Sequence, residues 1–540
     1  MKRRFASILA ILLSALALTA CEPNLKLFGL DDPNDYNPSE DIHTDDDIVP
    51  EKREYVYKGE NALNHLGGDT GTIRFQTGGS SAEKALWDSL IYNFQQSNPG
   101  ITVKSVNIDK NDILQAGLEA RTAPDVIQVD SSVFGAWAQK GWFQSIQPFI
   151  SGEVDGIEPL DTSIYYPQTM QMFKLSPVTG VRGEGEIFGL PKDFGVQGIF
   201  VNRELVVDRY NRGAFSSYPQ GQDDYAKLMA QEQLTFEEYF RIAHHLTYNC
   251  VINGEGKHEH NGYWQDNVYG ANRIHWEAFL WGLGSDILTD DYKLNIEDEY
   301  VQYVFEQCRN QVTKGSASFY SLYSDTGATD SGTAFTGRRL CMYMGGRWNV
   351  STFDSSFVTT SQNPAESKYF CIPVPVYKVK NGKPVRAPIA SCSTVCYAIS
   401  RNCQNTKMAY KLIRYLASRE GYRTMNTLNY AVPGIRDLKN ENEFKDPMKY
   451  NSPYYGGFGN VICNLDEKSA STFFDMADEA RISNACRFTN DNWIVTFETG
   501  LNLFLQDTGK TRFPTSYDFL KSVYKSVNSA IKKSDPQLFW

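Results

Sequence analysis

Between residues 71 and 130 the apolar positions change repeatedly from the spacing of strands to that of helices. The segments GTIRFQTGG and ITVKSVNI are short and apolar and end at turns, so we predict a strand in each. Between them, Leu86, Leu90 and Phe94 recur at helical spacing and predict an amphipathic helix. NDILQAGLEARTA predicts a second helix and PDVIQVD a third strand. This β-α-β-α-β order predicts a parallel sheet with helices on both faces.

The later segments repeat this pattern. EIFGLPKDFGVQGIFVNREL contains two strand-like pieces, and LTFEEYFRIAHHLT predicts a helix capped by Thr235. We expect further helices over HWEAFLWGLGSDIL and, as one long amphipathic helix, over KMAYKLIRYLASREGYRTM. No short internal repeat is visible, which argues against a solenoid or a propeller. At 540 residues, the chain is long enough for more than one α/β lobe.

Residues 1–21 have the order of a bacterial export signal, with basic Lys2 to Arg4 before the apolar run from Phe5 to Leu18. This run is shorter than the ~20 residues that span a bilayer. Small residues precede Cys21, and the site resembles the lipobox of bacterial lipoproteins. The resemblance implies that the Cys21 thiol is acylated, for example with palmitate, and anchors the mature chain on the extracytoplasmic face of a membrane. A secreted protein with a chance cysteine is the alternative.

Residues 22–66 are rich in Asp, Glu, Pro and Asn and poor in apolar residues, as in DDPNDYNPSEDIHTDDD. Such a segment cannot bury enough apolar surface to fold. We therefore expect an acidic, flexible tether that holds the folded body away from the membrane.

The formal net charge of −11 argues against nucleic acid as a partner, because phosphate binding needs clustered Lys and Arg. The ten cysteines show neither a CxxC pair nor zinc-ligand spacing, so most are expected to be small buried apolar residues, while a few disulfides stay possible. Cys392 and Cys396 are expected on one face of a single strand.

The sequence lacks the GxSxG, HExxH and GxxxxGK[ST] motifs of common hydrolases and nucleotide-binding proteins. His258 and His260 lie in a Gly/Asn-rich segment, but no matching ligands are evident, so no metal and no cofactor are expected. A pair of carboxylates for glycoside hydrolysis stays open, because 64 acidic residues allow many pairings.

An ordered series of segments covers roughly residues 70–436. It comprises TGGSSAEK, SNPGITVKSV, LEARTAPDVIQVDSSVFGAWAQKGWFQSIQPFI, IFGLPKDFGVQGIFVNREL, LTFEEYFRIAHHLT, FTGRRLCMYMGGRWNVSTF, STVCYAISRNCQNTKMAYKLIRYLASREG and YAVPGIRDL. In this order the segments resemble the extracellular solute-binding proteins of ABC importers, specifically the family 1 group that captures sugars and oligosaccharides.

The resemblance implies an α/β protein with the type II periplasmic-binding-protein-like fold, two lobes joined by a hinge. Lobe one would contain residues 67–192 and 378–425, and lobe two residues 200–368 and 430–540, including extended C-terminal insertions. The chain would cross between the lobes near 193–199, 369–377 and 427–433. The role of the insertion over 437–465 stays open.

The function implied by the resemblance is capture of a sugar in the cleft between the lobes and its delivery to the membrane permease of an ABC importer. The protein would be a monomer without enzymatic activity, and a separate ATPase would supply the energy. Two alternatives stay open: a glycan-active surface enzyme, and the same fold with a peptide, polyamine or other solute as its ligand.

Polar residues at strand ends are candidate ligand contacts, because ligands of open α/β sheets bind beyond the carboxyl ends of the strands. Ser80 and Ser81 follow the first predicted strand, and Asp130 and Ser131 follow the third. Lys192–Asp193 lies beside the expected hinge, where charged groups would bond sugar hydroxyls. The serines are equally interpretable as helix caps and the charged pair as a surface ion pair.

Aromatic side chains are candidates for the apolar faces of sugar rings. Trp348, next to two glycines, is the first choice, and Trp276 belongs to a second aromatic tract with Trp281, for which a core position is favoured. Arg347 is a candidate to grip a carboxylate, which would favour an acidic sugar, or to pair with an acidic side chain of the protein.

Overall fold

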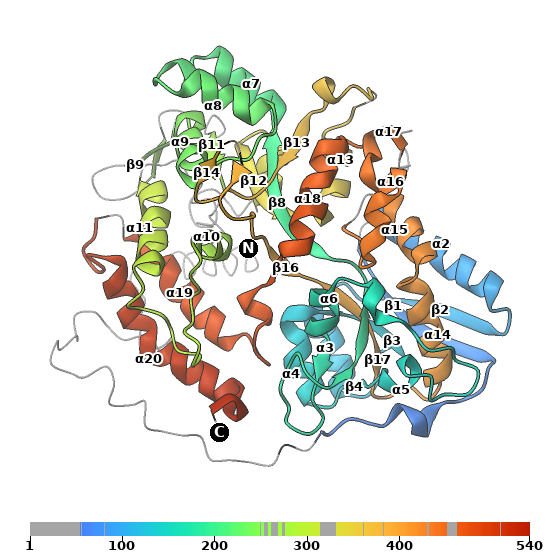
Figure 1. Cartoon of the computed structure of the whole chain (residues 1–540). Coiled ribbons are helices and arrows are strands. Elements are labelled where there is room, and N and C mark those ends of the chain that lie inside the picture. The colour runs from blue at the N-terminus through green and yellow to red at the C-terminus, as the bar shows by residue number, and fades with distance from the viewer. Residues whose placement is uncertain are drawn as a thin grey trace, which may run out of the picture.

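The computed structural model describes residues 55, 57–79, 81–248, 250–252, 258–260, 268–272, 276–313, 331–359, 361–381, 383–428, 431–450, 462–507 and 509–539. Within these ranges, two six-stranded sheets organise two α/β lobes (Figure 1). The strand β8 (Gly195–Asn202) lies at the centre of the second sheet and begins where the chain leaves the first lobe.

The first sheet has the strand order β2-β1-β3-β17-β4, with β7 paired to β17. Its strands are β1 (Gly71–Thr77), β2 (Ile101–Asn107), β3 (Val126–Asp130), β4 (Phe143–Gln144), β7 (Gly189–Pro191) and β17 (Val395–Ser400). The strands β1, β2 and β3 are parallel, as predicted, but β17 runs antiparallel to β3. The sheet is therefore mixed, because β17 begins opposite Asp130, where β3 ends.

Helices cover both faces of the first sheet, and Leu90 and Phe94 of the first of them are fully buried, as the periodicity predicts. The helices are α2 (Ser81–Ser97), α3 (Asn111–Glu119), α4 (Ser131–Gln139), α5 (Gln147–Ile150), α6 (Pro167–Met172), α14 (Thr406–Leu416) and α15 (Arg419–Asn426). The single long helix expected over the last two is wrong. The Ser418 side chain accepts a hydrogen bond from the Gly421 N–H and starts a new helix.

The second sheet has the order β11-β12-β8-β16-β18, with β13 paired to β8. Its other strands are β11 (Tyr269–Ala271), β12 (Leu340–Gly346), β13 (Tyr369–Ile372), β16 (Ser391–Ser393) and β18 (Arg481–Ile482). The strand β8 is buried along almost its whole length, which explains its continuous apolar sequence.

The second lobe also holds most of the helices that follow β8. They are α7 (Arg203–Asn211), α8 (Gly221–Met229), α9 (Phe236–Leu246), α10 (Trp276–Leu283), α11 (Glu299–Thr313), α12 (Ser331–Thr336), α13 (Val350–Ser356), α18 (Glu467–Glu479), α19 (Asn492–Gln506) and α20 (Ser516–Ser534). The predicted cap of α9 is confirmed, because Thr235 and Glu238 form a reciprocal capping box.

Short hairpins and short helices lie outside the two main sheets. They are the hairpins β5 (Lys174–Leu175) with β6 (Glu186–Ile187), β9 (Cys250–Ile252) with β10 (His258–His260), and β14 (Val379–Lys380) with β15 (Lys383–Pro384), and the helices α16 (Asn442–Lys445) and α17 (Pro447–Tyr450). The described part of the 437–465 insertion packs against α18.

Residues 57–66 are ordered against lobe one, so the tether expected over 22–66 is too long at its C-terminal end. The Tyr57 hydroxyl donates to the Phe143 carbonyl at 2.5 Å, and the Thr406 hydroxyl donates to the Ala62 carbonyl at 2.8 Å. Ala62 itself is buried. Cys21 and the export signal lie outside the described residues. In the described part of the chain, no helix has the length and apolar character required to cross a bilayer.

Among the described residues, three chain segments cross between the sheets. The first runs through Lys192–Phe194, between β7 and β8, and the second through Thr394, between β16 and β17. The third passes Val432, whose carbonyl accepts from the Phe194 N–H at 2.7 Å. The second crossing expected at 369–377 is wrong, because β13 pairs with β8 inside the second sheet. For the same reason β16 belongs to that sheet, and the lobe-one boundary expected at 378 is corrected to Thr394.

The cysteines follow this division. Cys392 lies in β16 and Cys396 in β17, so they belong to different sheets, and the expectation of one shared strand is wrong. The eight cysteines from Cys308 to Cys486 in the described residues are all buried. They behave as the small apolar residues that the sequence predicts.

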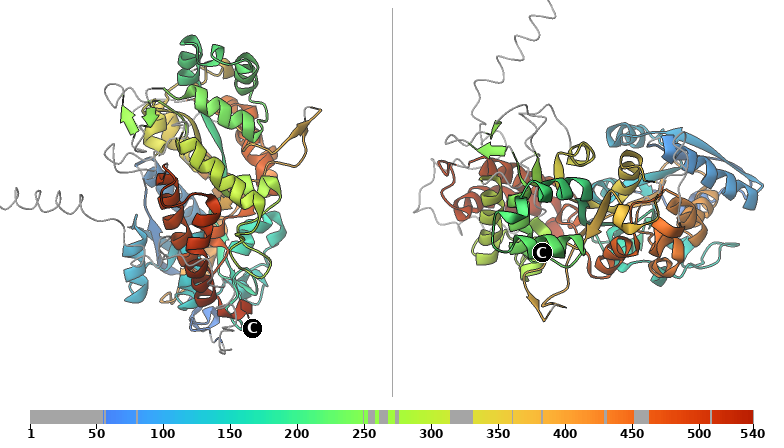
Figure 2. Two further views of the ribbon diagram at one scale, coloured as in Figure 1. Left: turned by 90° about the vertical axis from the view of Figure 1, so that its left-hand side faces the viewer. Right: turned by 90° about the horizontal axis from the view of Figure 1, so that it is seen from above.

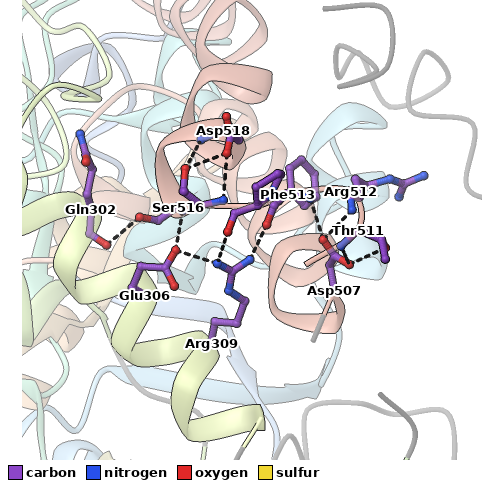
Figure 3. Close-up of polar contacts among 11 residues, drawn as sticks. Gln302, Glu306, Arg309, Asp507, Thr511, Arg512, Phe513, Ser516 and Asp518 are labelled. Carbon is purple, nitrogen blue, oxygen red and sulfur yellow. Dashed lines mark hydrogen bonds and ion pairs between the residues drawn. The ribbon is translucent and has the colours of Figure 1, made fainter. Parts of the chain in front are cut away.

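The C-terminal helices α19 and α20 pack side by side and both contact α11 (Figure 2). The Arg309 side chain of α11 is fully buried at this junction and donates to the Phe513 carbonyl at 2.5 Å and the Glu306 carboxylate at 2.7 Å (Figure 3). Glu306 also accepts from the Ser516 N–H at the start of α20. Asp507 shapes the connecting loop by accepting the backbone N–H groups of residues 511–513.

We predict that Arg309→Met lowers the free energy of unfolding by about 3 kcal/mol, because it removes the charged partner of the Glu306 carboxylate and the side-chain donor to the Phe513 and Pro514 carbonyls. Urea unfolding followed by circular dichroism measures the change. Arg512→Met is the matched control, since the Arg512 side chain of the same loop makes none of the contacts drawn in Figure 3. Equal stability of the two variants would contradict this account of the junction.

Candidate functional site

Four of the candidate residues gather around Thr394, where two crossing segments touch the end of β3. The Ser131 N–H donates to the Thr394 carbonyl at 2.9 Å, and the Thr394 N–H donates to the Ser131 hydroxyl at 3.1 Å. The Thr394 hydroxyl lies 3.1 Å from the Asp193 carboxylate. These contacts fix the end of β3 against the crossing segments.

Asp130 and Lys192 border this cluster. Asp130 caps α4 by accepting from the Ser132 N–H at 2.8 Å and the Ser132 hydroxyl at 2.6 Å. The Lys192 ammonium lies 5.2 Å from the centroid of the Trp87 ring, a favourable cation–π distance. Four residues that the sequence suggests as ligand contacts therefore lie in one neighbourhood of the structure: Asp130, Ser131, Lys192 and Asp193.

Asp193 is a buried acidic residue in the first crossing segment. Burial raises its pKa, and the neighbouring Lys192 and the Thr394 hydroxyl oppose that rise without cancelling it. A carboxyl group in this state responds to any movement that changes its exposure to water.

A pocket of about 230 Å³ opens next to this cluster, with walls from both lobes. We call it the interlobe pocket, and its lining residues are Gln171, Met172, Arg182, Gly183, Trp281, Asp286, Arg481, Ile482, Asn484, Cys486 and Arg487. Gln171 and Met172 belong to α6, and Arg182 and Gly183 follow it, beside lobe one. The other lining residues belong to lobe two. The Cys486 thiol donates to the Ser131 hydroxyl at 3.1 Å, so the pocket adjoins the cluster around Thr394.

A buried carboxylate positions one wall of the interlobe pocket. Glu277 of α10 accepts from the Ser391 hydroxyl at 2.5 Å, the Ser483 hydroxyl at 3.2 Å and the Asn484 N–H at 2.7 Å. Burial raises the pKa of Glu277, and its hydrogen bonds oppose that rise. Glu277 thereby holds the segment after β18 against α10 and β16.

Three arginines are among the polar residues that line the pocket. Arg182 is buried and donates to the carbonyls of Ser131 and Phe488. The Arg481 guanidinium lies 5.8 Å from the Trp281 ring centroid, and Arg487 pairs with Asp286 at 3.2 Å. A flat ring beside several hydrogen-bond donors is suited to a polyhydroxylated ligand with apolar ring faces.

The remaining candidates lie elsewhere. Trp348 is half-buried, and its ring packs against the backbone of Gly195 and Gly346 at the first crossing. Trp276 is in the core of lobe two, between Phe305 and Phe497, and donates to Glu498. The tract that contains it therefore reaches the pocket through Trp281.

Arg347 is fully buried, with its guanidinium 5.1 Å from the Phe474 ring, so it does not present a cation to the pocket. Ser81 is the first residue of α2, and its side chain lies outside the description, as does the whole of Ser80. The side chains of His258 and His260 lie outside it too. Among the described residues, no group of three His, Cys, Asp or Glu side chains is arranged to hold a metal ion.

Sequence reasoning missed Arg182, Arg481 and Arg487. The core position that it favoured for Trp281 is confirmed, since this residue is 3% exposed, although it also borders the pocket. Arg481 and Arg487 flank the segment ISNAC, which contains the polar residues Ser483 and Asn484, in the connection between two amphipathic helices. A polar connection of this kind, with two arginines six positions apart, is the one signal that pointed to them.

A family model described as "Bacterial extracellular solute-binding protein" matches residues 89–451, more than half of the chain. The chain belongs to this family. A comparison of this solute-binding protein with curated proteins gives no significant match.

Solved structures confirm the two-lobe fold expected from the sequence. An ABC substrate-binding protein from Listeria monocytogenes, in complex with cycloalternan, has a TM-score of 0.59 and 16% identity over 85% of this chain and 99% of its own. A solute-binding protein from Thermotoga lettingae, bound with α-D-tagatose, scores 0.58 at 16% identity over 86% and 100%. The sugar-binding protein MalE from Xanthomonas citri scores 0.57 at 17% identity over 86% and 98%.

We predict that Asp193→Asn gains stability relative to the solute-binding protein itself as the pH rises from about 4, the pKa of an unfolded aspartate. The raised pKa means that the folded state holds this proton more tightly than the unfolded chain, so stability is lost as the pH rises through the folded pKa. Urea unfolding between pH 4 and 7.5 measures the difference. Asp208→Asn, on the exposed face of α7, controls for the loss of one negative charge. A difference that stays constant or falls with pH would refute the assignment.

Proposed function

We propose that this solute-binding protein captures a sugar or oligosaccharide in the interlobe pocket and delivers it to the permease of an ABC importer. The observation that carries the proposal is a pocket with walls from both lobes, directly beside the crossing segments, in a chain of this family. The sugar complexes of structurally similar proteins support the choice of ligand.

The chemistry of the pocket supports a saccharide. Trp281 is 3% exposed and contributes a small apolar part of the lining, while Gln171 and Asn484 supply amide groups that both donate and accept hydrogen bonds. The volume of about 230 Å³ lies just below the ~300–1,000 Å³ of typical small-molecule sites, so it suits one sugar ring of a longer chain.

Movement of the lobes about the crossing segments is the proposed mechanism of capture. A saccharide that touches both walls binds one arrangement of the lobes better than the other and shifts the population towards it. Lys192–Phe194 and Thr394 form the hinge, and Asp130, Ser131, Asp193 and the half-buried Trp348 are proposed as further ligand contacts beside it. The permease would recognise the ligand-bound arrangement.

Anchoring and location complete the proposal. The protein would be a monomer, and acylation of Cys21 would hold it on the extracytoplasmic face of a membrane. The acidic segment that ends before Tyr57 would be the flexible tether between this anchor and the folded body. The protein would bind its sugar without altering it. Release of reducing ends from a glycan by the purified chain would favour the alternative of a surface enzyme.

We predict that Trp281→Leu and Trp348→Ala each weaken saccharide binding about tenfold or more, because each removes a large aromatic surface. Isothermal titration calorimetry with mono- and oligosaccharides measures the dissociation constants. Tyr92→Ala removes an exposed aromatic ring of α2 and serves as the control. Unchanged affinity in both tryptophan variants, with binding intact, would place the ligand elsewhere, and no binding by the unsubstituted chain across the panel would contradict the proposed function.

A further inference from the structure

The interlobe pocket has an unbalanced charge. Three guanidinium groups line it, from Arg182, Arg481 and Arg487, and the single carboxylate in the lining is that of Asp286. Glu277 lies behind the wall, but it is engaged by three donors and burial raises its pKa, so it does little to balance the arginines. The net charge of the lining is positive in a chain whose net charge is −11.

Arg481 is the most available of the three. It is exposed on β18, at the edge of the second sheet, and no ion pair in the described ranges includes it. Its guanidinium is near the Trp281 ring, at 5.8 Å. A cation beside a flat aromatic surface provides both partners for a sugar ring that carries an acidic group.

Arg487 has a partner that a ligand can displace. Its ion pair with Asp286 joins two side chains that are each 31% exposed. Pairs with this degree of exposure contribute little to stability. A ligand carboxylate that enters the pocket therefore replaces the Asp286 contact at little cost.

Arg182 is a buried cation without an ion-pair partner among the described residues. Its guanidinium donates to the carbonyl oxygens of Ser131, Met172 and Phe488. The carboxylates of Asp130 and Asp535 influence it from farther away. A buried charge that lacks a direct ion pair is costly, and an anion in the adjoining pocket offsets that cost.

We propose that the interlobe pocket selects saccharides that carry a carboxylate, that is, uronate-containing sugars. This inference rests on the proposed function and narrows its ligand class. Arg481 grips the carboxylate through its planar fork while Trp281 packs against the ring, and Arg487 adds a second cation when it leaves Asp286. The acidic-sugar role that the sequence suggested for the buried Arg347 belongs instead to these arginines.

The test uses acidic and neutral trisaccharides in matched pairs: trigalacturonate with galactotriose, triglucuronate with cellotriose, and trimannuronate with mannotriose. Calorimetry on the full chain measures affinity at low and at physiological salt. In at least one pair we expect the acidic member to bind ten times or more as tightly as the neutral one. We also expect its affinity to fall as salt rises, because salt screens partly exposed charges.

Two substitutions with opposite effects separate a charge-specific site from a general loss of structure. Arg481→Gln should weaken the acidic ligand about tenfold and a neutral one much less. Asp286→Asn should strengthen the acidic ligand, because it removes the competing carboxylate from Arg487. Arg212→Gln, at a distant exposed position on α7, is the control and should change neither.

Each outcome decides a separate point. Binding of neutral trisaccharides with no preference for the acidic members would overturn this inference and leave the proposed function standing. Loss of the acidic ligand in both Arg481→Gln and Asp286→Asn would overturn it as well. Absence of binding by every saccharide would contradict the proposed function itself.

Discussion

The hydrogen bonds among the crossing segments are the constraint on which the rest of the structure depends. The Lys192 N–H donates to the Val395 carbonyl at 2.8 Å, and the Phe194 N–H donates to the Val432 carbonyl at 2.7 Å. These bonds align the three crossings, and Thr394 ties them to Ser131 at the end of β3. These backbone bonds fix the place where the two lobes meet. The interlobe pocket lies there because Cys486 and Arg182 approach Ser131 at the same place.

Most of the fold could be predicted from the sequence, because local chemistry fixes its elements. The capping box at Thr235 and the helical spacing of Leu90 and Phe94 each specify an element without help from distant residues. The errors have long-range causes. The segment from Cys392 to Cys396 has the pattern of a single strand. The chain nevertheless crosses from one sheet to the other at Thr394, and no local pattern marks that crossing. The break at Ser418 depends on a single side chain that caps the next helix.

The site was only partly predictable. Residues that follow strands were found, because strand ends are visible in the sequence: Asp130, Ser131, Lys192 and Asp193. The aromatic tract was found too, but the member chosen from it was Trp276, whereas Trp281 borders the pocket. Trp276 and Trp281 are five positions apart, which is about 140° around a helix. Every position of α10 except Glu277 is buried and apolar, so periodicity does not show which side faces the pocket. The arginines around it come from distant segments that meet only in the folded protein.

The central claim is that a saccharide binds between the lobes, against the contact of Cys486 with Ser131. Protection of the Cys486 thiol against alkylation, followed by mass spectrometry, tests this claim most directly, because Cys486 lines the pocket while Cys371 and Cys463 lie in the core of lobe two. With a saccharide that binds in calorimetry, the account predicts that the modification of Cys486 slows more than that of the other two. General stabilisation by a ligand slows all three alike. Equal slowing, or no slowing of Cys486 at saturation, would contradict the account.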